Sequence, residues 1–358
     1  MNKKLIGFLV ALPVILVGHS CGNDQGPDSL SAYPLEMRAI DLSFLPELRS
    51  YNVQFRNPEG NVEDALEIFR KAGCNTVRLR VWHTPESVNS SLDEVVEFAE
   101  EIRNKGMKVW ITLHYADHWA DPGQQTKPAA WASAEVNVLA DCVFTYTKQV
   151  VNKINPDYIQ IGNEINNGFL WPDGHINNEE SFVFLLSKGL QAVREVSSAK
   201  TIIHFAGSDG SIPFFTLLKN KSLDYDLTAL SYYSRWHTPL LSELDNTIGQ
   251  LNTLTGKKLV IAETAYPFTL GWNDWTTNLV GLPEHLIDGF PASEEGQYNF
   301  LLELRKIVAE KNGLGICYWA PEWVAYKGPE AADGSPWENM ALFDFGNKAL
   351  KGVKALRQ

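Results

Sequence analysis

The chain has 358 residues, 44% of them hydrophobic, and carries a formal net charge of −12 at pH 7. This length and composition allow one large buried core, so a single folded domain is enough to account for the chain. The negative charge and the lack of a Lys/Arg-rich run argue against nucleic acid as a partner and favour a neutral ligand.

The N-terminus predicts an export signal. Lys3 and Lys4 precede an apolar stretch over residues 5–17, and small residues lead to Cys21. The stretch is too short for a spanning helix. It resembles a bacterial lipoprotein signal, in which Cys21 is acylated after cleavage. We therefore expect residues 1–20 to be removed, 21–35 to be a flexible tether and 36–358 to be the catalytic domain. The lipid would be its only membrane contact, in the outer membrane, at the cell surface or in the periplasm of a Gram-negative bacterium.

From about residue 36 the sequence alternates short apolar runs with amphipathic segments, the pattern of a parallel sheet with crossover helices. Helical periodicity covers, for example, residues 62–72, 91–105 and 293–312, and a glycine stops each helix. The expected strands are 38–41, 76–81, 108–113, 158–161, 201–205, 227–231, 258–262 and 314–319. Eight such units predict a single α/β domain, a (β/α)8 TIM barrel with long loops that form a cleft at the C-terminal rim.

Three cysteines remain after Cys21, namely Cys74, Cys142 and Cys317. Their spacing matches no Cys/His zinc pattern, and an odd number cannot form a complete disulfide framework. Each lies in an apolar context that suits a small buried side chain. Structural thiols are expected, and a single disulfide is the alternative.

Polar and aromatic side chains gather at the ends of the expected strands. Glu164 and Glu263 each follow an apolar run directly, and Asn163 precedes the first. Either glutamate alone is more commonly a solvated loop residue or an N-cap partner. Together, on the rim where a barrel builds its active site, two carboxylates indicate glycoside cleavage.

Longer motifs carry a family resemblance. Residues 114–131, which begin at His114 and include Asp117, Trp119 and Asp121, resemble the loop after the third strand of the family 53 glycoside hydrolases, the endo-β-1,4-galactanases of clan A. The other matching segments, in the same order and spacing, are 78–82, 161–164, 230–233, 262–266 and 337–344. The resemblance covers roughly residues 36–356. It implies an endo-acting, retaining hydrolase of β-1,4-galactosidic bonds in galactan and in the type I arabinogalactan side chains of pectin. It also implies a monomer that needs no cofactor for chemistry.

The same resemblance implies that Glu164 is the acid/base and Glu263 the nucleophile. Retention needs the two carboxyl groups about 5–5.5 Å apart. Arg80 is expected to keep Glu263 ionised and to orient it, and a salt bridge that only closes the barrel rim is its alternative role. Asn163 is expected to bond the sugar 2-hydroxyl.

Further residues of the rim are expected to support catalysis or to contact the sugar. His114 and Tyr233 are the candidates for support, although they and His237 are equally compatible with structural roles. Asp117 and its loop neighbours are as compatible with pinning that loop as with binding ligand. The expected substrate contacts are Trp82, Asp117, Trp119, Trp236, His237, Trp319 and Trp323.

A structural calcium site is also suggested by the resemblance, since bacterial relatives bind Ca²⁺ between the loops after strands seven and eight. Asp274, Asn278, Ser335 and Glu338 offer oxygen ligands there. Trp272 and Trp275 interrupt the acidic run expected in the first loop. The alternative is two solvated loops with ordinary polar residues.

Two other function classes stay open. One is another clan A endo-glycanase on the same barrel, such as a β-mannanase or a cellulase. The other is a surface glycan-binding lipoprotein without chemistry, against which the presence of both carboxylates and Arg80 counts.

Overall fold

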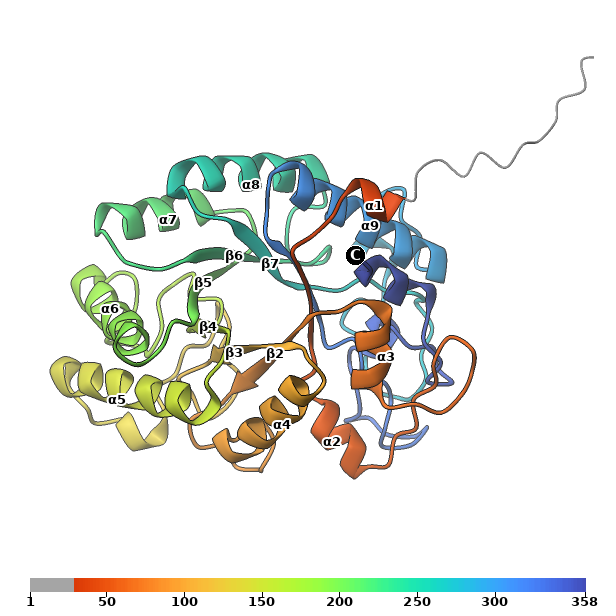
Figure 1. Ribbon diagram of the computed structural model, residues 1–358, viewed down its shortest axis with the longest axis horizontal. Coiled ribbons are helices and arrows are strands. Elements are labelled where there is room, and N and C mark those ends of the chain that lie inside the picture. Colours follow the sequence, from red (N-terminus) through yellow and green to blue (C-terminus); the bar gives the residue numbers. More distant parts are fainter. Residues whose placement is uncertain (1–28) are drawn as a thin grey trace, which may run out of the picture.

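A computed structural model describes residues 29–358 of the chain, so the expected signal, Cys21 and the first part of the tether lie outside the described residues. Parallel strands β1 to β8 follow one another in sequence order around a closed barrel, and the helices form a ring outside them (Figure 1). The expected (β/α)8 barrel is confirmed.

The strands agree with their predicted positions to within one or two residues. Strands β2, β3 and β4 have the predicted bounds, and β7 runs two residues further than expected because the register shifts where it pairs with β6 and β8. The observed strands are β1 (Met37–Asp41), β2 (Thr76–Val81), β3 (Lys108–Leu113), β4 (Tyr158–Ile161), β5 (Lys200–Ala206), β6 (Leu227–Tyr232), β7 (Leu259–Thr264) and β8 (Gly315–Trp319).

Three of the helices begin directly after a residue whose side chain caps them. The predicted helix over 62–72 begins later, at Ala65, because the Asp64 carboxylate accepts from the Leu66 N–H. Ser91 and Ser293 cap α4 and α9 in the same way. The observed helices are α1 (Ser29–Ala32), α2 (Leu45–Ser50), α3 (Ala65–Ala72), α4 (Leu92–Asn104), α5 (Val136–Ile154), α6 (Glu179–Val196), α7 (Ser211–Asn220), α8 (Leu241–Thr255) and α9 (Glu294–Glu310).

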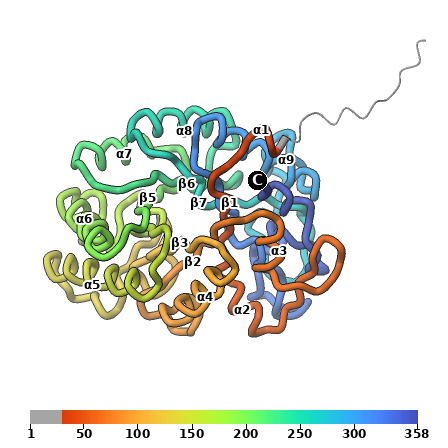
Figure 2. Tube along the Cα trace, in the orientation of Figure 1, coloured from red at the N-terminus to blue at the C-terminus, as the bar shows by residue number. Residues whose placement is uncertain are grey.

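The two ends of the described chain meet on α9. The buried Arg305 guanidinium donates to the carbonyl oxygens of Tyr33, at 2.6 Å, and Ala355, at 3.0 Å. Figure 2 shows α1 and the C-terminus beside this helix. Within residues 29–358, no helix combines the length and the apolar character that a membrane span requires.

The three cysteines in this part of the chain are free thiols, as expected. Cys74 and Cys317 are buried, whereas Cys142 is only partly covered. Burial raises the pKa of the Cys317 thiol well above its usual value, so this side chain stays neutral inside the barrel.

The barrel interior changes from apolar to polar along the strands. At its base, Met37, Ala39, Trp110 and Cys317 belong to one buried apolar cluster. Gly315 lets β8 approach β1 there, because a Cβ at this position would lie 1.8 Å from the Met37 carbonyl oxygen. Closer to the carboxyl ends, buried polar groups replace the apolar ones, and these form the floor of the site described next.

Candidate active site

A cavity of about 720 Å³ opens at the carboxyl ends of the strands. Residues that lie in or just after each of the eight strands line it, so the convergence on one rim that the sequence predicted is present. The residues from the sequence prediction that line it are Arg80, His114, Trp119, Asp121, Asn163, Glu164, Tyr233, Trp236, His237, Glu263, Trp319 and Trp323.

The two glutamates face one another across this cavity. A carboxylate oxygen of Glu164 lies within 4.8 Å of one from Glu263. Glu164 follows β4 in the left-handed region, with φ of 47°, after Gly162 with φ of 80°. Glu263 belongs to the irregular part of β7, where the shifted register pairs it with Ser231. The separation suits a nucleophile and an acid that act on the same bond from two sides.

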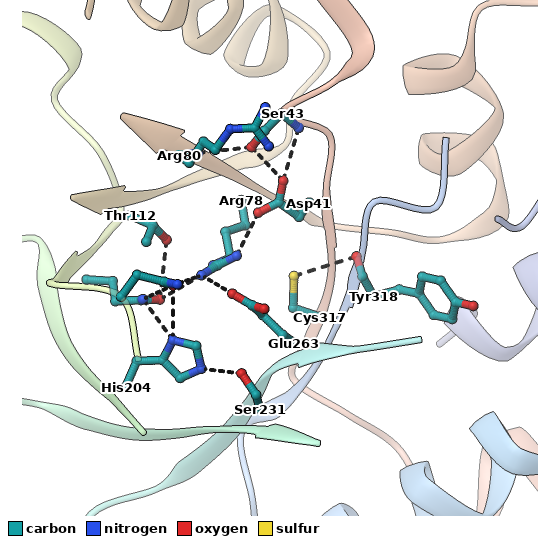
Figure 3. A network of polar contacts seen from close by, with 12 residues as sticks. Asp41, Ser43, Arg78, Arg80, Thr112, His204, Ser231, Glu263, Cys317 and Tyr318 are labelled. Atoms are coloured by element: carbon teal, nitrogen blue, oxygen red, sulfur yellow. Dashed lines mark hydrogen bonds and ion pairs between the residues drawn. The ribbon is translucent and has the colours of Figure 1, made fainter. Parts of the chain in front are cut away.

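Arg78, and not Arg80, holds Glu263. Its Nη2 donates to Glu263 Oε1 at 2.8 Å, and its Nη1 donates to Asp41 Oδ2 at 2.7 Å, with the side chain 1% exposed (Figure 3). The role predicted for Arg80 is therefore wrong. Both arginines point into the barrel, but Arg80 lies about 6.6 Å further along β2, above the level of the carboxylates.

Arg80 instead occupies an aromatic cage at the rim. Its Nε donates to Ser90 Oγ at 2.8 Å, and its guanidinium lies 4.1 Å from the ring centre of Phe44 and 4.4 Å from that of Trp119. Among residues 29–358 no carboxylate lies within 4.0 Å of it, so the alternative rim salt bridge is not formed either. Arg80 supports Trp119 from below by cation–π contact.

Burial and charge give the two glutamates different protonation behaviour. Burial, and then the nearby charge of Glu263, raise the pKa of Glu164 to about 8, while the hydrogen bond from Ser231 opposes that rise. Burial also raises the pKa of Glu263, but the Arg78 guanidinium and the Tyr233 hydroxyl, which donates to Oε2 at 3.0 Å, both favour its carboxylate. Neutral pH lies below the pKa of Glu164, so its carboxyl is protonated there, while the contacts with Arg78 and Tyr233 favour the carboxylate form at Glu263.

Hydrogen bonds within the protein hold Asn163, His114 and His237 in place. Asn163 Oδ1 accepts from Arg78 at 2.9 Å, and its Nδ2 donates to the Ala120 carbonyl at 2.9 Å. Nδ1 of His114 accepts from the Ala120 N–H at 3.2 Å, and Nδ1 of His237 accepts from the Tyr233 N–H at 3.0 Å. Burial lowers the pKa of both histidines, that of His237 to about 4, so both rings are neutral.

Two predicted substrate contacts do not line the cavity. Trp82 packs edge-on against Trp119, with ring centres 5.3 Å apart, and so supports a lining residue from behind. Asp117 accepts from the N–H groups of Thr84 at 2.9 Å and Ala129 at 2.8 Å. This is the loop-pinning role that the sequence left open.

Several lining or supporting residues were missed. Asp41, the last residue of β1, accepts a hydrogen bond from Arg78, and Ser231 of β6 donates one to Glu164. Each contact joins residues that are far apart in the sequence, so no local pattern reveals it. Trp337 stacks on Trp236, with ring centres 6.1 Å apart and planes 7° from parallel, and both line the cavity. Its place in the matching segment 337–344 was the one available signal.

The four residues proposed as calcium ligands are buried together in the loops after β7 and β8. Burial, and the charge of Asp274, raise the pKa of Glu338 to about 7. Ser335 Oγ donates to the Trp323 carbonyl at 2.5 Å. Three inaccessible oxygens have no hydrogen-bond partner, namely Asp274 Oδ2, Asn278 Oδ1 and Glu338 Oε2. Two ordinary solvated loops do not describe this arrangement.

Comparisons with known proteins identify the family of the chain. The family model described as glycosyl hydrolase family 53 matches residues 37–356. An arabinogalactan endo-beta-1,4-galactanase of Cellvibrio japonicus is 33% identical over 362 residues, which cover 96% of this chain and 93% of that protein. The solved GH53 catalytic domain of Ignisphaera aggregans is 36% identical with a TM-score of 0.84, over 90% of this chain and 95% of that one. A structure of fungal beta-1,4-galactanases is 28% identical with a TM-score of 0.78, over 90% and 99% of the two chains.

The buried ion pairs of Arg78 can be tested through stability. Arg78→Met leaves Asp41 and Glu263 buried together without a cation, which should lower the free energy of unfolding by about 3–5 kcal/mol. Adding Glu263→Gln removes one of the two buried carboxylates that lack a cation, so the double variant should recover part of the lost free energy of unfolding. Urea denaturation of both single variants and the double variant completes the cycle. Strictly additive effects would contradict the pairing.

Proposed function

The chain belongs to glycosyl hydrolase family 53, and on that basis we propose that it is an endo-acting, retaining enzyme that cleaves β-1,4-galactosidic bonds in galactan. The substrate includes the type I arabinogalactan side chains of pectin. The observation that carries the reaction type is the pair of buried carboxylates within 4.8 Å, one with its pKa raised to about 8 and the other held by Arg78.

In the first step Glu263 attacks the anomeric carbon while Glu164 protonates the departing glycosidic oxygen. The C–O bond breaks, and a covalent glycosyl-enzyme forms. Arg78 and the Tyr233 hydroxyl bind the two oxygens of Glu263 from different sides, so one carboxylate rotamer is fixed before substrate arrives. Asn163, whose amide lines the cavity beside Glu164, is the candidate partner for the sugar 2-hydroxyl.

In the second step the roles of Glu164 reverse. Esterified Glu263 carries no charge, so the repulsion that helps to raise the pKa of Glu164 disappears. Glu164 is then a carboxylate that can remove a proton from the attacking water. Water replaces Glu263 at the anomeric carbon, and the configuration is retained.

The shape of the cleft supports galactan over flat β-1,4-glycans. An axial 4-oxygen in each galactose makes the chain curve, so it needs aromatic faces at several angles. Trp119 and Trp319 are tilted by 57° to one another, Trp319 and Trp323 by 76°, and Trp319 and Trp337 by 77°. A mannanase or cellulase on the same barrel would bind a straighter chain. A binder without chemistry would not need the preserved carboxylate pair.

The proposed activity predicts a fast fall in galactan viscosity with slow release of galactose, because cleavage occurs within the chain. Mannan and cellulose should remain intact. Glu263→Gln is the matched control, since a neutral amide of the same shape cannot act as the nucleophile, and turnover should fall to less than about a hundredth. Viscometry and reducing-sugar assays on the three polymers measure this. Galactose alone with long chains persisting would show an exo enzyme instead.

We also propose that Asp274, Asn278, Ser335 and Glu338 hold a structural Ca²⁺ that joins the loops after β7 and β8. The donor set fits, because it consists of oxygens and three of them are buried without partners. The ion would neutralise Asp274 and Glu338 and fix the two loops that carry Trp337 and Leu279 to the cleft. No step of the reaction passes through it.

Calcium removal should lower the melting temperature. Ion binding to the folded state alone adds about 2.7 kcal/mol at a free concentration a hundred times the dissociation constant. Asp274→Ala should abolish the response to EDTA and to added Ca²⁺. Asp288→Ala removes an exposed carboxylate from the same loop and should leave the response intact. An unchanged melting curve for protein stripped of metal would rule out the ion.

Finally, we propose that the enzyme is exported and anchored to the membrane by a lipid on Cys21. The support is the sequence of residues 1–21, with its basic start, its apolar stretch, and Gly18 and Ser20 shortly before the cysteine. Labelling of cells with a palmitate analogue should mark the protein, and Cys21→Ser should remove the label. Equal labelling of both forms would contradict acylation at this residue.

A further inference from the structure

A line of buried polar side chains connects the arginine of the nucleophile to the acid/base. It runs from Arg78 through Gln160, His204 and Ser231 to Glu164. Gln160, His204 and Ser231 are fully buried at 0% exposure. The two-carboxylate reaction assigns no role to these three. Figure 3 shows His204 and Ser231 on the side of the cluster away from Asp41.

The first link is fixed by the amide of Gln160. Its Nε2 lies 3.0 Å from the Gly162 carbonyl oxygen, which can only accept, so the nitrogen must face that way. Its Oε1 then accepts from Thr112 Oγ1 at 3.3 Å and from Arg78 Nη2 at 3.4 Å, both of which can donate. The orientation of the amide therefore follows from its neighbours.

The tautomer of His204 follows next. Nδ1 lies 3.0 Å from Gln160 Nε2, so a proton on Nδ1 would set donor against donor. The other close atom, Asn163 Oδ1, lies at 3.3 Å and already accepts from Arg78 at 2.9 Å and from Gln160 Nε2 at 3.1 Å, which occupies both of its lone pairs. Burial lowers the pKa of His204 well below its usual value, so the ring carries one proton. That proton is on Nε2.

Ser231 then has only one arrangement open. His204 Nε2 donates to Ser231 Oγ at 2.8 Å, which occupies an acceptor position of the hydroxyl. The single hydroxyl proton is left for Glu164 Oε1, which lies 2.5 Å away. Oε1 thus receives a hydrogen bond whether or not Glu164 is protonated.

We propose that Ser231, oriented by His204, is a positioning residue that reserves Oε1 of Glu164 as an acceptor and so places the catalytic proton on Oε2. In the first step of the reaction Oε2 gives that proton to the departing oxygen, and in the second step Oε2 takes one from water. The hydrogen bond at Oε1 persists through both. The inference rests on the proposed function, since it assigns Glu164 the acid/base role.

The other groups around Glu164 cannot replace the hydrogen bond from Ser231. Glu263 from β7 and Asp121 from the loop after β3 raise the pKa of Glu164, while Arg78 from β2 lowers it through charge. Ser231 is the only one of these four neighbours that donates a hydrogen bond to an oxygen of Glu164 within the described chain. Loss of its hydroxyl should therefore raise the pKa of Glu164 further and free the proton to occupy either oxygen.

The test compares Ser231→Ala, which removes the donor, with Ser231→Thr, which keeps a hydroxyl. Thr228→Val is the matched control, because it removes another buried hydroxyl from β6 that has no contact with Glu164. For Ser231→Ala we expect kcat on galactan to fall about tenfold, a fraction of what a general acid contributes. KM should stay unchanged, and the basic limb of the pH profile should move to higher pH. The kcat/KM for an aryl β-galactobioside with a good leaving group should change little, since its departure needs little protonation.

A purely structural role would lower both activities alike and leave the pH profile in place, which would overturn the proposal. A ¹³C titration of the Glu164 carboxyl, assigned with Glu164→Gln, gives a readout without substrate. The midpoint of this titration should rise in Ser231→Ala and in His204→Leu. Two variants are used so that the proposal can still be tested if one of them does not fold. A wild-type protein that cleaves no galactan would contradict the proposed function, whereas an unmoved midpoint in both variants would overturn the role of Ser231 by itself.

Discussion

The site depends on one buried cation. Arg78 is 1% exposed and lies between Asp41 of β1 and Glu263 of β7, with Trp110 5.5 Å from its guanidinium. Such a group costs several kcal/mol to desolvate, and only close carboxylates and further acceptors offset that cost. The closed barrel supplies them from strands that are distant in sequence, so the arrangement of charge in the cleft follows from barrel closure.

That single charge also separates the two glutamates. Both are buried, and burial raises the pKa of each. Arg78 bonds directly to Glu263 and reaches Glu164 only through space, so the carboxylate is favoured at one position and the acid at the other. The hydrogen bonds through Gln160, His204 and Ser231 also distinguish the two oxygens of Glu164. Each donor fixes the orientation of the next side chain, and the last one, Ser231, donates to Oε1.

The outer parts of the cleft depend on support of a different kind. Trp119 rests on Arg80, and Trp236 stacks on Trp337, so each exposed ring is held in place by a more deeply buried side chain. Near Trp337, Glu338 and Asp274 are buried with unpaired oxygens, an arrangement that favours a cation in place of bulk water. A rigid aromatic cleft of this type gives a curved sugar chain fixed surfaces to bind.

The sequence by itself determined the barrel, the positions of β2, β3 and β4, the carboxylate pair, and most of the residues that line the cleft. These features come from apolar periodicity and from polar residues at strand ends, which are local signals. Only the tertiary structure decided that Arg78 and not Arg80 binds Glu263, and that Ser231 meets Glu164. Residues two apart on a strand share a face but differ in height, and the register shift between β6 and β7 sets which side chains are level. The height of a side chain within a closed barrel depends on the register of all the strands together, so it cannot be predicted from any one segment of the sequence.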